Sequence, residues 1–98
     1  MNLIEKYPDR VPVVIVPKEN IKIDRVKFLI PKEYPFGKFV SYIVSSFLEP
    51  TNSKQAYYFF TKENTLVPTS ILMSSLYESH KDPDHMLRLS LRIENTFG

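Results

Sequence analysis

Apolar residues recur every three or four positions along residues 36–48, and this spacing predicts an amphipathic helix. Pro35 suits the start of such a helix, and Pro50 stops the pattern. The apolar stripe consists of Phe36, Phe39, Val40, Ile43, Val44, Phe47 and Leu48. Because the stripe is wide and rich in aromatic side chains, we expect it to pack against the core.

Four other segments have the alternating apolar pattern of strands: residues 11–16, 25–30, 56–61 and 86–93. The first is apolar on both faces, so we expect it to lie between two layers. The last alternates between an apolar side and a more polar side that carries Arg88, Ser90 and Arg92. The polar connector between the first two strands is too long for a tight turn, so we expect antiparallel pairing through an open loop.

The remaining segments predict shorter elements. Residues 3–7 suit the last turn of a helix that Pro8 ends. Residues 62–65 predict a turn in which Asn64 adopts a positive φ. Thr69 or Ser70 is expected to cap a short second helix, and residues 81–85 are expected to form a charged loop. The inward side chains of this short helix are expected to be Leu72, Met73, Leu76 and Tyr77.

The order of elements is strand, strand, long helix, strand, short helix, strand. A hairpin, a crossover helix and a returning strand predict an α+β fold with the long helix on one face of a mixed sheet of about four strands. This is the β-grasp arrangement of ubiquitin. We expect a single ubiquitin-like domain over residues 1–98, in which residues 94–98 form a flexible tail after the last strand.

Composition narrows the class of protein. The 98 residues carry a formal net charge of +2, too small and too scattered to favour a nucleic-acid partner. The absence of cysteine excludes a disulfide framework, a thiolate metal site and a cysteine nucleophile. No apolar run approaches the ~20 residues that span a membrane, and we expect no signal peptide.

The sequence offers little for an enzyme, and we predict none. His80, Asp82, Asp84 and His85 lie close together, but a loop of solvated charges explains them better than a metal site with defined ligand spacing. The chain has only two glycines, Gly37 and Gly98, and no glycine-rich phosphate loop. We therefore expect neither a metal nor a cofactor.

Gly98 follows the last predicted strand after a short tail. A glycine carboxylate has no side chain that hinders attack at the carbonyl, and glycine tolerates unusual backbone angles. An activating enzyme could thread such a tail into a narrow channel and transfer the acyl group to a thiol and then to an amine. Because this chain has no cysteine, it would be the group transferred in thioester chemistry.

Nearly the whole chain, from Glu5 to Gly98, resembles the autophagy ubiquitin-like modifiers of the GABARAP type. The matching segments, in order, are Glu5-Lys6-Tyr7-Pro8-Asp9-Arg10-Val11-Pro12-Val13, Lys27-Phe28-Leu29-Ile30-Pro31, Pro68-Thr69-Ser70, Leu76-Tyr77-Glu78, His80-Lys81-Asp82 and Glu94-Asn95-Thr96-Phe97-Gly98. Several separate matches in the right order are far more specific than any single motif.

The resemblance implies conjugation through Gly98. An E1-like enzyme would activate the glycine with ATP, and an E2-like enzyme would pass it to phosphatidylethanolamine, which tethers the protein to autophagosomal membranes. A cysteine protease would process the tail and later release the protein from the lipid. Both this protease and the E1-like enzyme would recognise Phe97 and Gly98. The unconjugated protein would be cytoplasmic and would meet membrane only through its lipid.

The resemblance also implies docking of receptors and adaptors that carry an aromatic-x-x-aliphatic motif, which adds to the edge of the second strand. The aromatic pocket would use Leu3, Pro12, Lys27, Leu29 and Met86. The aliphatic pocket would use Phe28, Ile30, Pro31, Phe39, Tyr42 and Ile43. A purely structural role in the core is an equally good interpretation of Ile43.

The chain departs from the family in two places. Val44, Ser45 and Ser46 stand where a basic cluster usually follows the long helix's isoleucine, and the two helices that usually precede the first strand are largely missing. We therefore expect an altered motif preference and a more open groove beside the second strand. Two alternatives stay open: conjugation to a protein lysine, and an adaptor that is never conjugated.

Overall fold

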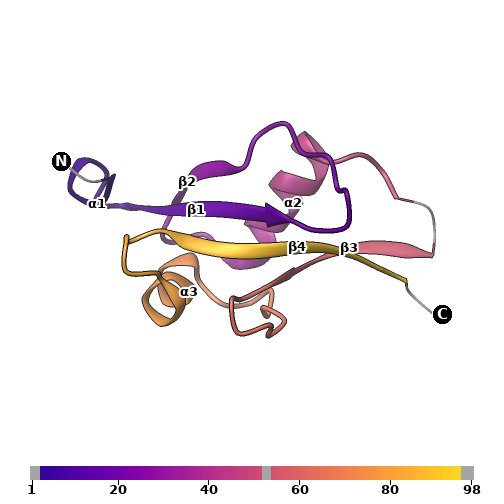
Figure 1. The fold of residues 1–98 in the computed structure, drawn as a ribbon. Coiled ribbons are helices and arrows are strands. Elements are labelled where there is room, and N and C mark those ends of the chain that lie inside the picture. Colours follow the sequence, from indigo (N-terminus) through magenta and orange to yellow (C-terminus); the bar gives the residue numbers. More distant parts are fainter. Residues whose placement is uncertain (1–2, 52–53, 96–98) are drawn as a thin grey trace.

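A four-stranded sheet carries one long helix on one of its faces (Figure 1). The computed structural model describes residues 3–51 and 54–95, without the side chains of residues 3 and 4. The elements in chain order are α1 (Leu3–Lys6), β1 (Arg10–Pro17), β2 (Lys27–Pro31), α2 (Phe36–Phe47), β3 (Gln55–Phe60), α3 (Met73–His80) and β4 (Leu87–Asn95). The predicted order of strands and helices is confirmed.

The strands lie in the order β2-β1-β4-β3, and the sheet is mixed as predicted. β1 pairs antiparallel with β2 and parallel with β4, while β3 pairs antiparallel with β4. Val13 faces Phe28 on one side and Leu87 on the other, and all three side chains are buried. The register therefore aligns the apolar positions of neighbouring strands on the face that α2 covers.

Phe39 is the central side chain of the core. It has no exposed surface, and its ring lies 6.2 Å from that of Phe28 and 5.9 Å from that of Phe59. Since Phe28 belongs to β2 and Phe59 to β3, this one residue of α2 packs against both outer strands of the sheet.

The predicted cap of the short helix is wrong. Helix α3 begins at Met73, its N-cap residue Leu72 makes no side-chain capping bond, and the Leu72 side chain is 44% exposed where an inward position was expected. The physical reason is that the backbone of Thr69 and Ile71 accepts hydrogen bonds from the N–H groups that begin α2. Gly37 permits this approach, since a Cβ there would lie 3.3 Å from Thr69 O.

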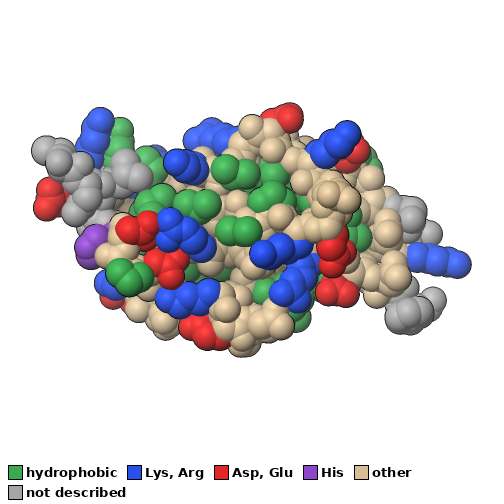
Figure 2. Space-filling view, in the orientation of Figure 1, with side chains coloured by type: hydrophobic (Ala, Val, Ile, Leu, Met, Phe, Trp, Pro, Cys, Tyr) green, Lys and Arg blue, Asp and Glu red, His purple; other side chains and the backbone are tan. Residues whose placement is uncertain are grey.

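Other details of the sequence prediction can be compared directly. Asn64 has a φ of 67°, as predicted for its turn. β2 begins at Lys27, two residues later than predicted, so Arg25 and Val26 lie before the strand. The residues expected on the sheet face opposite α2, Val14, Val16 and Leu29, are half-buried there. Figure 2 shows this face, where apolar patches lie between groups of basic and acidic side chains.

Candidate functional site

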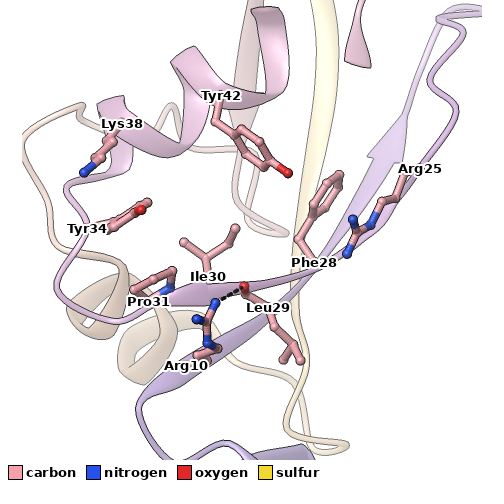
Figure 3. Close-up of a pocket in the computed structure, with 9 residues that line it drawn as sticks. All are labelled: Arg10, Arg25, Phe28, Leu29, Ile30, Pro31, Tyr34, Lys38 and Tyr42. Atoms are coloured by element: carbon pink, nitrogen blue, oxygen red, sulfur yellow. Dashed lines mark hydrogen bonds between the residues drawn. The ribbon is translucent and has the colours of Figure 1, made fainter. Parts of the chain in front are cut away.

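A pocket of about 330 Å³ opens between β2 and the first half of α2 (Figure 3). Tyr42 and Lys38 reach into it from the helix, one turn apart, while Phe28 and Ile30 contribute from the strand. The full lining is Arg10, Arg25, Phe28, Leu29, Ile30, Pro31, Tyr34, Lys38 and Tyr42. The pocket thus lies at the strand where the sequence predicts peptide docking.

The wall of the pocket is aromatic and aliphatic. Phe28 and Ile30 are each 4% exposed and belong to both the core and the wall. The Tyr42 ring lies 6.3 Å from that of Phe28 in an edge-to-face arrangement, and Tyr42 is 41% exposed. An aromatic ring with a buried base and an open face suits an apolar side chain from a partner.

Four of the six residues expected in the aliphatic pocket line it: Phe28, Ile30, Pro31 and Tyr42. The other two, Phe39 and Ile43, have no exposed surface and lie in the core behind the wall. Both occupy the inner face of α2, so they hold the helix against the sheet. A partner would reach them only if α2 moved.

Three of the residues expected in the aromatic pocket, Pro12, Lys27 and Leu29, lie on neighbouring positions of β1 and β2. Pro12 pairs with Leu29, and Val14 pairs with Lys27, so β1 and β2 bring Pro12, Lys27 and Leu29 into one neighbourhood. Met86 directly precedes β4 and is half-buried, whereas Pro12 is fully buried and could only form the floor of a pocket. The backbone of Leu3 lies in α1, but its side chain is outside the described part.

Cations surround the pocket between β2 and α2. Arg10, Arg25 and Lys38 all line it, and within the described chain no acidic side chain does. Arg25 Cζ lies 4.9 Å from the centre of the Phe28 ring, and Lys38 Nζ lies 4.1 Å from that of Tyr34. The rim is therefore electropositive even though α2 carries serines where the family's basic cluster would lie.

The sequence prediction did not include Arg10, Arg25, Tyr34 and Lys38. Two signals could have found part of this set. Arg10 belongs to the first segment that resembles the family, and Lys38 precedes Tyr42 by one helical turn, which places both on one face of the predicted helix. Arg25 has no such signal, because its position depends on where β2 begins.

β2 is an outermost strand whose free edge can be assigned from the hydrogen bonds. Ile15 N–H donates to Val26 O at 2.8 Å, so Val26 points its backbone groups toward β1. Because backbone groups alternate along a strand, Phe28 and Ile30 also point toward β1, while Lys27 and Leu29 point outward. These two residues offer the edge on which a further strand could pair.

The charged loop before β4 is a network of ion pairs. Arg88 donates to Asp82 at 2.9 Å and to Asp84 at 2.7 Å, and Lys62 donates to Asp82 at 3.0 Å. The hydrogen bonds from Arg88 lower the pKa of Asp84 to about 2, and those from Lys62 and Arg88 lower the pKa of Asp82. In residues 3–51 and 54–95, no three His, Cys, Asp or Glu side chains are grouped as metal ligands would be.

The predicted conjugation residues, Phe97 and Gly98, lie outside the described residues. Glu94 and Asn95, which the sequence prediction placed in the flexible tail, instead belong to β4 and pair with Ala56 and Gln55 of β3. Within the described part of the chain, the helices are too short or too polar to cross a membrane.

The chain is similar to known autophagy proteins over nearly its whole length. The profile of the family described as "Autophagy protein Atg8 ubiquitin like" matches residues 1–98. Autophagy-related protein 8d of Arabidopsis thaliana is 44% identical over 97 residues, which cover 96% of this chain and 78% of that protein. Autophagy-related protein 8B of Oryza sativa subsp. japonica is 42% identical over 97 residues, which cover 96% and 79%. The crystal structure of Trypanosoma brucei ATG8 superposes with a TM-score of 0.76 at 33% identity, covering 97% of this chain and 82% of that one.

Proposed function

This chain belongs to the Atg8 family of autophagy ubiquitin-like proteins, and on that premise we propose two activities for it. The first is docking of short aromatic-x-x-aliphatic peptides along β2. The second is conjugation through Gly98 to phosphatidylethanolamine, which would move the protein from the cytoplasm to autophagosomal membranes. Its partners would be E1-like and E2-like enzymes, a processing and delipidating cysteine protease, and receptors that carry the motif.

The observation that carries the docking proposal is the pocket of about 330 Å³ beside the free edge of β2. An extended peptide that pairs with Lys27 and Leu29 would be held in register by backbone hydrogen bonds. Side chains three positions apart on such a peptide would then point toward the two faces of β2. One would enter the pocket bounded by Phe28 and Tyr42, and the other would meet Leu29 and Met86.

The rim of the pocket favours acidic residues in the peptide. Arg10, Arg25 and Lys38 supply three positive charges around a wall that is otherwise apolar. Exposed charges of this kind change the association rate and the choice of partner more than they change affinity. Ser45 and Ser46 stand in the part of α2 where the resemblance leads us to expect a basic cluster, so the rim charge comes from Arg10, Arg25 and Lys38.

Conjugation is supported by the end of the sequence, because residues 94–98 resemble the family's processed tail. ATP would convert the Gly98 carboxylate to an adenylate with release of pyrophosphate. A thiol of the E1-like enzyme would displace AMP, and a thiol of the E2-like enzyme would displace the first thiol. The amine of phosphatidylethanolamine would then attack the thioester, form the amide and release the E2 thiol.

Reconstitution with the E1-like and E2-like enzymes, ATP and liposomes tests the conjugation proposal. Deletion of Gly98 should abolish the product, and Gly98→Ala should slow thioester formation by about tenfold or more, because a methyl group displaces the reacting carbonyl. Asn95→Ala is the matched control and should be conjugated normally. Conjugation of the Gly98-deleted chain would refute the assignment.

The chemical identity of the product decides between the conjugation partners. Mass spectrometry of the wild-type reaction, supplied with both liposomes and a protein acceptor, should show an amide with the lipid headgroup. An isopeptide bond to a lysine would assign the chain to protein conjugation instead. Unchanged localisation of a Gly98-deleted protein in cells would favour an adaptor that is never conjugated.

A further inference from the structure

Two tyrosines give the pocket between β2 and α2 an unusually aromatic wall. Tyr34 lies between the strand and the helix, Tyr42 lies on the helix, and Figure 3 shows their side chains on either side of Ile30. Phe28 adds a third ring, which packs edge-to-face on that of Tyr42 at 6.3 Å. A side chain that enters the pocket therefore meets three aromatic rings.

The structure holds both tyrosine rings in place before any ligand binds. Tyr34 N–H donates to Pro31 O at 3.1 Å, and Lys38 Nζ lies 4.1 Å from the centre of the Tyr34 ring. The Tyr42 ring packs edge-to-face on that of Phe47 at 5.5 Å. Because a preformed pocket loses little freedom on binding, the fit of the entering side chain should appear directly in the affinity.

The hydroxyl groups of the two tyrosines can bond to a ligand. The Tyr57 hydroxyl, by contrast, donates to Glu49 O at 2.7 Å and is already used by the fold. Within the described part of the chain, no protein group forms a hydrogen bond with the hydroxyl of Tyr34 or of Tyr42. The pocket thus combines apolar walls with two polar groups, which suits an aromatic side chain that has a polar edge.

The size of the pocket also favours a ring. A cavity of about 150 Å³ is enough to hold benzene. The pocket of about 330 Å³ therefore has room for a whole tyrosine side chain, whereas a leucine would leave part of it empty. Unfilled space costs the dispersion contacts that the wall could otherwise make with its ligand.

We propose that this pocket selects an aromatic side chain, tyrosine above all, at the second anchor of the docked peptide in place of the aliphatic residue. This inference rests on the proposed docking function, and it makes Tyr34 and Tyr42 the residues that determine specificity. The entering ring would pack against Phe28 and Tyr42. Its hydroxyl would form a hydrogen bond with that of Tyr34 or Tyr42.

The test uses two labelled peptides that differ only in the second anchor, which is leucine in one and tyrosine in the other. Their dissociation constants are measured by fluorescence anisotropy on the full chain. The variants Tyr34→Leu and Tyr42→Leu each replace one ring of the wall by an aliphatic side chain. Tyr58→Leu is the matched control, because Tyr58 is a half-buried tyrosine of β3, at the other edge of the sheet. Thermal unfolding checks that each variant is folded.

We expect the wild-type chain to bind the tyrosine peptide about threefold to tenfold more tightly than the leucine peptide, because the ring contacts and a hydrogen bond both favour it. Tyr34→Leu and Tyr42→Leu should each reduce this preference about threefold or more, chiefly by weakening the tyrosine peptide. Tyr58→Leu should keep the preference of the wild type.

Two outcomes would overturn the inference. If the wild type binds the leucine peptide at least as tightly as the tyrosine peptide, or if both pocket variants keep the full preference, the tyrosines do not select a ring, but docking stands. If neither peptide binds the wild type or any variant, the docking proposal fails and this inference fails with it, while conjugation is judged by its own assay.

Discussion

The two outer strands of the sheet have their free edges covered in different ways. At β3, the chain's own backbone covers the end of the strand: Val67 N–H donates to Phe59 O at 3.3 Å, and Leu66 forms a bridge with Phe60. At β2, the outward oxygens of Lys27 and Leu29 accept hydrogen bonds from arginine side chains. A backbone cover is part of the fold, whereas an exposed side chain can be displaced by a partner.

At each edge an arginine also lies above a phenylalanine ring, but the two arginines donate hydrogen bonds to different kinds of group. Arg92 lies over Phe60 and donates to the side chain of Asn64, so it holds a turn of the protein itself. Arg25 lies over Phe28 and donates to a backbone oxygen of the strand edge. Similar ring contacts therefore hold an arginine against a turn of the protein at β3 and against the free strand edge at β2.

Loss of the Phe39 side chain, which packs against both outer strands, should have the largest effect on stability. Phe39 packs against Phe28 of β2 and Phe59 of β3, and it is fully buried. Phe39→Ala should lower the free energy of unfolding by about 3–5 kcal/mol, because it removes a ring and leaves a cavity. Chemical denaturation followed by circular dichroism measures this loss.

Tyr42→Ala is the matched control for Phe39. Tyr42 lies on the same helix, and its ring packs against those of Phe28 and Phe47, but it is 41% exposed. We expect a loss of about 1 kcal/mol in stability together with weaker peptide binding. Equal losses for the two variants would contradict the assignment of Phe39 to the core and Tyr42 to the pocket.

A proline in the free edge of β2 should have the next largest effect. The Leu29 N–H points outward, so Leu29→Pro removes a donor that the sheet does not use, and edge strands tolerate such a change. Binding of an aromatic-x-x-aliphatic peptide should weaken by about tenfold or more, because one backbone hydrogen bond is lost and the ring crowds the added strand. Anisotropy measures the binding, and thermal unfolding checks the fold.

Two variants sharpen this result. Leu29→Ala keeps the N–H and should weaken binding less than Leu29→Pro does, which separates the backbone contribution from that of the side chain. Tyr57→Pro places a proline at an outward position of β3, at the other edge of the sheet, and should leave peptide binding unchanged. Similar losses of binding for the β2 and β3 prolines would show that the peptide does not distinguish the edges.

The sequence predicted the fold well because the fold depends on local apolar periodicity. The stripe on α2 and the alternation in 86–93 are strong local patterns, and the structure places most of their apolar residues in the core or packed against it. The positive φ of Asn64 follows from turn chemistry that involves few residues. Each of these features is determined by residues that are neighbours in the chain.

Features that depend on distant backbone groups could not be predicted in this way. Thr69 matches a helix cap by residue type, but its carbonyl accepts from Gly37 instead. The roles of Arg10 and Arg25 depend on which oxygens of β2 point outward, and that depends on the register with β1. Local patterns identify which residues are buried but not which polar groups meet.

The two halves of the sheet also differ in what their arginines bind. Near β2, Arg25 and Arg10 bind neutral carbonyl oxygens, which do not titrate. Near the start of β4, Arg88 binds Asp82 and Asp84, whose side chains are 16% and 51% exposed. Acidification should therefore act on the loop before β4 and leave the contacts of Arg25 and Arg10 in place.

The smallest expected effect is a pH dependence confined to that loop. Hydrogen bonds from Arg88 lower the pKa of Asp84 to about 2, from an ordinary value of 3.8, so folding gains stability from this carboxylate above about pH 4 and loses it as the pH falls toward 2. Asp84→Asn should therefore flatten the decline in unfolding free energy between pH 5 and pH 3, measured by urea titration at each pH.

Arg25→Ala should keep the wild-type slope, since its partner is a carbonyl oxygen. Parallel curves for wild type and Asp84→Asn would show that the Arg88–Asp84 pair does not stabilise the fold. A flattened curve for Arg25→Ala would contradict the separation between the two halves of the sheet.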